Sequence, residues 1–282
     1  THRGSSAASD VYKRQALSTG WFGLSTAEFL MPVTIIYALT IMDWRNIWII
    51  ISVAIILFLP LVSYFLVKEV KLSSRENDTE VIKENIKQWK RSEVIKDYRF
   101  IIIALNMLAM PWIATGIFVY QSFILSAKNW GEYTIAQSFM VYSIASVLTL
   151  FVAGYLIDKF TSRKLLIYMN IPFLISLLIL IYFQSPVSSF FFLGLIGVSN
   201  GFANVLGSST WAELYGVKFI GSIKALTTAL MVFSTAFGTA LFGLMIDFDF
   251  SIEQISMISG GYILISLILL FLIKNKLNPT IL

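Results

Sequence analysis

The sequence predicts an all-α, polytopic membrane protein, on the basis of its composition, its long apolar segments and the distribution of its basic residues. Of the 282 residues, 57% are hydrophobic and 13% are charged, and the mean hydropathy is +0.78. A soluble domain carries about 25% charged residues, and a single hydrophobic core stops growing near this chain length. Lipid must therefore solvate much of the apolar surface. The apolar segments are continuous and do not alternate with polar residues, which argues against a β-barrel.

Residues 1–15 are polar and unlike the rest of the chain. They lack the apolar stretch that a secretory signal peptide contains. We therefore predict a non-native or disordered tail here and leave it out of the fold prediction. A genuine disordered cytoplasmic tail is the alternative.

Eight windows are long and apolar enough to cross a bilayer, since a membrane helix needs about 20 mostly apolar residues. They cover residues 20–41, 46–67, 100–125, 134–157, 164–183, 187–210, 224–246 and 255–273. The glycines and prolines inside them are tolerated in membrane helices. Aromatic residues near the window ends are expected to anchor the helices at the membrane surface, for example Trp21, Trp44, Trp48, Trp112 and Trp130.

Basic residues predict the orientation. With residues 68–99 in the cytoplasm, the outer loops contain only Arg45 and Lys128 among the basic residues after residue 15. Such a bias marks the cytoplasmic side of a membrane protein. We expect a multi-pass protein of the cell (inner) membrane with a cytoplasmic C-terminus. The net charge of +5 then reflects topology and contact with anionic lipid, so no nucleic-acid partner is expected.

Residues 68–99 form a charged linker between the second and third windows. Within it, Ile82, Ile86 and Trp89 recur at helical spacing. The basic residues that accompany this stripe are Lys83, Lys87, Lys90 and Arg91. The pattern predicts a short amphipathic helix on the inner membrane surface, with a solvated flexible linker as the alternative.

The segment 154–164, GYLIDKFTSRK, follows the fourth window. It resembles the loop signature of the major facilitator superfamily in its second copy, between helices eight and nine. Thr161 or Ser162 stands where that family has its second glycine. Two windows before the charged linker and six after it also resemble the twelve-helix arrangement of that family with its first four helices absent.

Three further segments carry the same resemblance. Trp44 and Arg45 resemble the outer loop between helices five and six, with Asp43 in place of a glycine. The segments 211–216 (WAELYG) and 221–224 (GSIK) resemble the turn from helix ten to helix eleven, and Asp247 fits the outer end of helix eleven. The resemblance implies a major-facilitator-like helical bundle with eight of an expected twelve membrane helices. Residues 16–67 would be the last two helices of the N-terminal half, and residues 100–282 the complete C-terminal six-helix half.

The resemblance also implies a cytoplasmic gate or latch. Its residues are Gly154, Asp158, Lys159, Arg163, Lys164, Glu213 and Lys224. Gly154 would let two helices approach closely, and Asp158 would accept hydrogen bonds from the helix that begins near Ser18 to Gly23. Glu213 would pair with Lys218 or Lys224. The alternative is that these charges only set the topology.

Inside the apolar windows, Glu28 is the one acidic or basic residue far from a window end. Burying a charge in a membrane is costly, so Glu28 should face a cavity, be paired or be protonated. It is our candidate for proton coupling or for an interhelical lock.

Substrate contacts should come from polar groups near the membrane midplane. The candidates are Asn106, Thr115, Gln121, Tyr142, Asn200, Asn204, Ser234 and Thr235. Each of them has a hydrogen bond to a neighbouring helix as its alternative role.

The residue inventory excludes several classes of chemistry. The chain has no cysteine, and its one histidine, His2, lies in the polar tail, so neither a zinc site nor histidine acid–base catalysis is expected. No phosphate-binding loop of the ATPase type is present.

The resemblance implies a secondary active transporter that works by alternating access, as a monomer, without cofactors, coupled to protons or sodium ions. An organic anion such as a monocarboxylate is the expected small-molecule substrate. The alternatives are a membrane-embedded enzyme and a receptor or scaffold.

Overall fold

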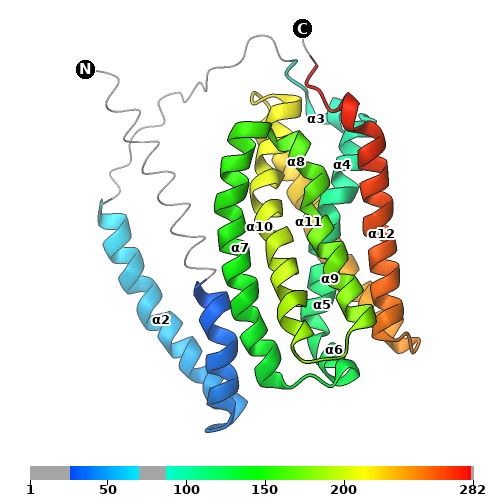
Figure 1. Ribbon diagram of the computed structural model, residues 1–282. Helices are drawn as coiled ribbons and strands as arrows, with labels where there is room; N and C mark the ends of the chain where they lie inside the picture. Colours follow the sequence, from blue (N-terminus) through cyan, green and yellow to red (C-terminus); the bar gives the residue numbers. More distant parts are fainter. Residues whose placement is uncertain (1–25, 70–86, 281–282) are drawn as a thin grey trace.

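The computed structural model describes residues 26–69 and 87–280, and all regular elements in these two ranges are helical. The first helix is Thr26–Leu39. It is followed by α2 (Trp44–Glu69), α3 (Arg91–Val94), α4 (Tyr98–Ala109), the π-helical turn η1 (Met110–Ala114), α5 (Thr115–Val119), α6 (Gln121–Lys128), α7 (Glu132–Phe160), α8 (Ser162–Met169), α9 (Ile171–Tyr182), α10 (Ser188–Tyr215), α11 (Ile220–Asp247), α12 (Ile252–Ile273) and the 3₁₀ turn η2 (Lys274–Lys276). Figure 1 shows the helices from α4 to α12 gathered in one bundle, with α2 and the helix before it beside α7.

Seven stretches in the described ranges are long and apolar enough to cross a membrane. They are Trp44–Leu61, Tyr98–Val119, Glu132–Phe160, Ser162–Tyr182, Ser188–Tyr215, Ile220–Asp247 and Ile252–Lys276. These stretches match the second to eighth predicted windows, so the predicted all-helical membrane fold is confirmed. Of the first window, the structure describes the helix Thr26–Leu39, and residues 20–25 lie outside the described residues.

The bundle packs around α10, which lies against α7 along most of its length and also contacts α8 and α9. Helix α12 packs between α9 and α4, and α11 packs against η1 and α5. Two buried apolar clusters fill the interior. One includes Trp112, Phe192 and Phe242, and the other includes Phe100 and Trp211.

Glycines allow the closest helix crossings. A Cβ atom at Gly197 or Gly201 of α10 would overlap the backbone of α7 at Tyr142 or Ser146, and one at Gly238 of α11 would overlap the backbone of Trp112. Small residues serve this purpose in membrane helices. At Gly154 a Cβ would meet no described atom within 4 Å. The close approach expected there stays a prediction, because the helix that begins near Ser18 to Gly23 lies outside the described residues.

The span Tyr98–Val119 is interrupted by the π-helical turn η1, which contains Pro111. Proline has no N–H to donate and its ring crowds the preceding turn, so a regular α-helix cannot continue unchanged through it. A π-helical turn widens the helix at this point, and such turns are frequent at functional sites. The interruption directs the residues around Pro111 toward α11, which packs closely on η1.

The end of the charged linker that the structure describes is not helical before α3. Trp89 lies in this non-helical stretch, so the predicted amphipathic helix does not extend to it, while Ile82 and Ile86 lie outside the described residues. The Trp89 ring packs edge-on against Tyr215 with centroids 5.5 Å apart, and its backbone N–H donates to the Tyr215 carbonyl (3.1 Å). These contacts with Tyr215 therefore hold Trp89 against the bundle in a non-helical conformation.

Two of the predicted interfacial anchors are instead core residues. Trp112 and Trp130 are each 4% exposed, and Trp112 makes edge-to-face contacts with Phe242 and Tyr262. Trp44 and Trp48 are exposed, as expected for residues at the membrane surface. Trp21 lies outside the described residues.

Candidate functional site

An open cavity of about 550 Å³ lies between helices of the bundle and is lined from both apolar clusters, and Lys224, Thr228 and Met231 of its lining are exposed. Its walls come from α4, η1, α5, α7, α8, α10 and α11. Met110 and Tyr142 of one cluster and Met169 and Trp211 of the other line it. The volume lies within the usual range for small-molecule sites, which are concave, mostly apolar and supplied with a few polar groups.

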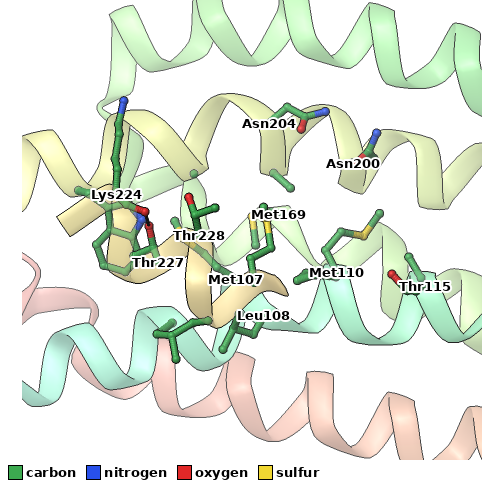
Figure 2. Close-up of a pocket in the computed structure, with 18 of the residues that line it drawn as sticks. Met107, Leu108, Met110, Thr115, Met169, Asn200, Asn204, Lys224, Thr227 and Thr228 are labelled. Carbon is green, nitrogen blue, oxygen red and sulfur yellow. Dashed lines mark hydrogen bonds between the residues drawn. The ribbon is translucent and has the colours of Figure 1, made fainter. Parts of the chain in front are cut away.

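Four of the predicted substrate residues meet in this cavity: Thr115, Tyr142, Asn200 and Asn204. Figure 2 shows Asn200 and Asn204 on one helix, across the cavity from Met107 and Met110, with Thr115 toward one end. The Nδ2 atom of Asn200 donates to Ser146 Oγ of α7 at 3.1 Å, which holds the carboxamide in place. Helical spacing brings Asn200 and Asn204 to the same face of α10.

The other four predicted substrate residues do not line the cavity. Asn106 is fully buried and donates to Ser266 Oγ (3.3 Å), and Ser234 donates to the Leu108 carbonyl (3.2 Å). These two bonds fasten α4 to α12 and to α11. Thr235 is half-buried and donates to its own helix, and Gln121 is exposed beside a separate small hollow at α6.

Lys224 is the one charged side chain among the described residues that line the cavity. It extends from the start of α11 together with Thr227 and Thr228, toward the opposite end of the cavity from Thr115 (Figure 2). Within the described chain, no carboxylate pairs with its ammonium group. Glu213, its predicted partner, instead pairs with Arg163, whose Nε lies 2.6 Å from Glu213 Oε1.

Glu28 lies in the helix Thr26–Leu39 and is half-buried. It lies near Tyr142, which lines the cavity from α7. A carboxylate within an apolar helix thus lies near the cavity wall. No ion pair between Glu28 and Arg163 or Lys164 is present in the described part of the chain.

One end of the bundle, shared by α3, α8 and the C-terminal residues, is rich in basic side chains, and we call it the basic end (Figure 1). Here Glu213, on the last turn of α10, accepts from the backbone N–H of Ser162 (2.9 Å) and from its hydroxyl. Arg163 also donates to the Leu277 carbonyl (2.9 Å) and to Asn278 (2.8 Å). The pair therefore joins α8, α10 and the C-terminal residues within the bundle.

The remaining predicted latch residues are exposed. Asp158, Lys159 and Lys164 make no ion pair with described residues, and the Lys159 ammonium lies 5.4 Å from the centroid of the Phe160 ring. The segment expected to meet Asp158, Ser18 to Gly23, lies outside the described residues.

A second polar cluster at the basic end was not predicted from the sequence. Asp97 pairs with Arg99 (2.8 Å) and accepts from the Tyr215 hydroxyl (3.2 Å), and both Asp97 and Tyr215 are buried. Arg99 also donates to the Asn278 carbonyl (2.8 Å). Beside it, Glu93 accepts from the Lys90 backbone N–H and pairs with Lys87 (3.0 Å), and these two contacts lower the pKa of Glu93.

The sequence prediction also missed the apolar lining. Met107, Met110, Met169 and Met231 all line the cavity. Methionine side chains are flexible and polarizable, which suits a surface that accommodates variable apolar groups. Pro111 was the available signal, because it marks the interruption in the span that brings Met110 and Thr115 to the cavity wall.

Comparison with protein families matches the Major Facilitator Superfamily over residues 4–216 and over residues 101–281. Comparisons with curated proteins and with solved structures gave no match. The two family matches overlap and together span most of the chain. Members of this family are multi-pass membrane transporters of small molecules, and they are not enzymes. The chain, with its helical spans and the open cavity between them, belongs to the Major Facilitator Superfamily.

Proposed function

We propose that the protein is a secondary active transporter of a small amphipathic organic anion, such as a monocarboxylate, and that the cavity holds this substrate during alternating access. The observation that carries the proposal is Lys224, the single charged side chain among the described lining residues. Its ammonium group provides a fixed positive charge that no carboxylate in the described chain neutralises. An anionic group of the substrate would supply the missing partner.

The rest of the lining supports an apolar body attached to that anion. Met107, Met110 and Met231 offer apolar surface, while Asn200 and Asn204 offer hydrogen-bonding groups farther from Lys224. Such a site binds one end of a substrate by charge and the remainder by shape and apolar contact. A cavity of about 550 Å³ holds a small organic acid and excludes polymers.

Glu28 supports coupling to protons. Its carboxylate lies within an apolar helix, near Tyr142 of the cavity wall. A charged carboxylate is costly in a membrane, so binding a proton would allow the carrier to move with a neutral side chain. A proton that travels with a monocarboxylate also leaves the transported pair without net charge.

The basic end is proposed to face the cytoplasm, in line with the preference of basic residues for that side. The Arg163–Glu213 pair (2.6 Å) joins elements within one bundle, so it stabilises that half of the carrier. Asp158 and Lys159 are exposed and are available to contact the other half. We propose that they form the part of the latch that changes between inward- and outward-facing states.

Counterflow in proteoliposomes tests the substrate class. The purified chain is reconstituted and loaded with unlabelled monocarboxylates of increasing chain length, and uptake of the labelled acid is measured. Lys224→Ala should raise the apparent KM for the acid about tenfold, because it removes a charge-assisted contact, whereas Lys224→Arg should retain most of the affinity. Lys224 and Lys218 are both exposed, and only Lys224 lines the cavity, so Lys218→Ala is the control that removes a similar charge at the same end outside the cavity.

Unchanged uptake by Lys224→Ala would refute the anion-binding role of this residue. Turnover of a chemical bond in the substrate, without counterflow, would refute transport itself. In the same vesicles, Glu28→Gln should abolish uptake driven by a proton gradient while counterflow continues. Equal loss of both activities would contradict the coupling role.

A further inference from the structure

A second cavity, of about 730 Å³, lies at the basic end between α7, α8, α10 and η2. Three cationic side chains line it: Arg163, Lys164 and Lys274. No acidic residue is present among its described lining residues. It shares no lining residue with the cavity that contains Lys224, so the two are separate sites.

Two of the three cations in this second cavity are uncompensated. The Arg163 guanidinium is already used by Glu213, by the Leu277 carbonyl and by Asn278. Lys164 and Lys274 are exposed, and in the described ranges neither pairs with a carboxylate. The nearest aromatic contact of Lys274 is Phe271, whose ring centroid lies 3.7 Å from the ammonium nitrogen. The cavity therefore presents two free positive charges.

The other part of the same cavity is apolar and opens on the outside of the bundle. Phe160 and Tyr168 line it and are 43% and 58% exposed. Phe202 and the buried Leu165 form its inner wall. Large exposed aromatic side chains on a membrane-spanning helix face the acyl region or the interface of the bilayer. Free ammonium groups and an apolar channel thus lie together at one end of the bundle.

We propose that this cavity binds an anionic phospholipid of the leaflet that faces the basic end, with its phosphate at Lys164 and Lys274 and an acyl chain along Phe160 and Tyr168. Basic pockets between membrane helices recognise lipid headgroups through this combination of charge and apolar surface. Inorganic phosphate would use the charges alone and leave the apolar surface uncovered, so the lipid fits the site better. This proposal concerns a site distinct from the substrate cavity and does not depend on which solute is carried.

Lipid titration monitored by native mass spectrometry tests the assignment. The purified, delipidated chain is titrated with phosphatidylglycerol and with phosphatidylcholine of identical acyl chains. Each lysine near an anionic headgroup contributes roughly fivefold in affinity, so Lys164→Ala with Lys274→Ala should weaken phosphatidylglycerol binding about 30-fold. Phosphatidylcholine binding should be weak and little changed.

The matched control is Lys96→Ala with Lys218→Ala, which removes the same charge from the same end of the bundle without touching the cavity. The charge-conserving pair Lys164→Arg with Lys274→Arg should retain phosphatidylglycerol binding, because both positive charges remain at the cavity. If the Lys96→Ala, Lys218→Ala pair weakened phosphatidylglycerol binding as much as the Lys164→Ala, Lys274→Ala pair, the proposal would be overturned. Equal affinity for phosphatidylglycerol and phosphatidylcholine would overturn it too. Displacement of phosphatidylglycerol by millimolar inorganic phosphate would identify a site for free anions instead of lipid. Because transport is not the readout, each of these outcomes leaves the proposed transport function unaffected.

Discussion

Helix α2 and the interrupted span from α4 to α5 are equally apolar but differ in how deeply they are buried. Trp44–Leu61 and Tyr98–Val119 have the same mean hydropathy, 1.9. Yet within an 18-residue window of each stretch, 6% of the residues are buried in the first and 61% in the second. Figure 1 shows the reason: α4 and α5 run inside the bundle, whereas α2 lies at its side. Hydropathy therefore determines that a segment enters the membrane, and other features of the segment determine whether it packs.

The size of the side chains accounts for much of this difference. The buried span contains Gly116 and three buried alanines, Ala104, Ala109 and Ala114, whereas α2 contains no glycine and a nearly continuous series of large aliphatic residues. Helices in a membrane gain no hydrophobic free energy from associating, so close backbone approach and interhelical hydrogen bonds must hold them together. The buried span supplies both, and lipid or another helix must cover the exposed face of α2.

Gly238→Ala is expected to have the largest effect on the bundle. A methyl group at this position would overlap the carbonyl of Trp112, which belongs to the interrupted span and cannot move as a flexible side chain does. We expect a loss of about 3 kcal/mol in the free energy of unfolding, which exceeds the gain of about 1 kcal/mol in helix propensity. Thermal unfolding in detergent, followed by tryptophan fluorescence, measures it.

Two controls accompany this substitution. Gly261→Ala in α12 adds the same methyl group where no atom lies within 4 Å, and Ala54→Val enlarges an exposed residue of α2. Both should leave the unfolding temperature unchanged or slightly raised. If Ala54→Val destabilises the protein as much as Gly238→Ala, packing density is not what separates the two regions.

The sequence predicted the membrane-spanning segments well, but it did not predict which residues on other helices each side chain contacts. Length and hydropathy identify a window such as 255–273 because the membrane imposes both on any spanning helix. Burial of Trp130 was missed because an aromatic residue near a window end serves equally well as a surface anchor or as a core residue. Only its partners, Phe192 and the Gln184 carbonyl, decide between these roles, and they are far away in the sequence. Trp112 lies in the middle of the window 100–125, which is no place for a surface anchor, so its position already argued for burial.

The same reasoning explains why only some of the predicted substrate residues line the cavity. Asn200 and Asn204 could be predicted because one helical turn places them on the same face. Asn106 and Ser234 have the same chemistry, but their partners Ser266 and Leu108 belong to other helices. Lys224 was assigned to the latch because its position at the start of a window says nothing of the cavity that begins there.

Two ion pairs extend the comparison to polar contacts. The Arg163–Glu213 pair of the bundle has a separation of 2.6 Å, and its side chains are 21% and 23% exposed. The Arg45–Asp43 pair at the start of α2 has a separation of 3.5 Å, and its side chains are 69% and 55% exposed. Glu213→Gln should cost about 2 kcal/mol, because Arg163 is left partly buried without its partner. Asp43→Asn should cost about 0–0.5 kcal/mol, since exposed pairs contribute little.

Denaturant titration of both variants in the same detergent checks this pair of values. Arg163→Lys supplies the second control, because it keeps the charge but loses the donors to Leu277 and Asn278, and its cost should fall between the other two. Equal effects of Glu213→Gln and Asp43→Asn would contradict the view that burial gives the bundle pair its strength.

The smallest expected effect is a gain in stability at Thr161, which ends α7 with φ 75° and ψ 146°. Gly216 ends α10 with nearly the same backbone, φ 79° and ψ 173°, a conformation that is available at low cost only to glycine. Thr161 is held there because the next residue, Ser162, donates to Glu213 from its backbone N–H and from its hydroxyl. Within the described residues, the Thr161 hydroxyl is buried without a hydrogen-bond partner.

Thr161→Gly should therefore raise the free energy of unfolding by about 1 kcal/mol, since relief of strain and loss of an unpaired hydroxyl exceed the added entropy of the unfolded chain. The reciprocal variant, Gly216→Ala, should lower the free energy of unfolding, because its methyl group would also meet the Gln88 side chain. The unfolding temperatures of the two variants in one detergent decide the matter. A lower unfolding temperature for Thr161→Gly would show that the methyl group of Thr161 packs usefully enough to offset its backbone strain. In that case the dense packing of the bundle would extend to its helix ends, and the contrast with α2 would be sharper than side-chain size alone explains.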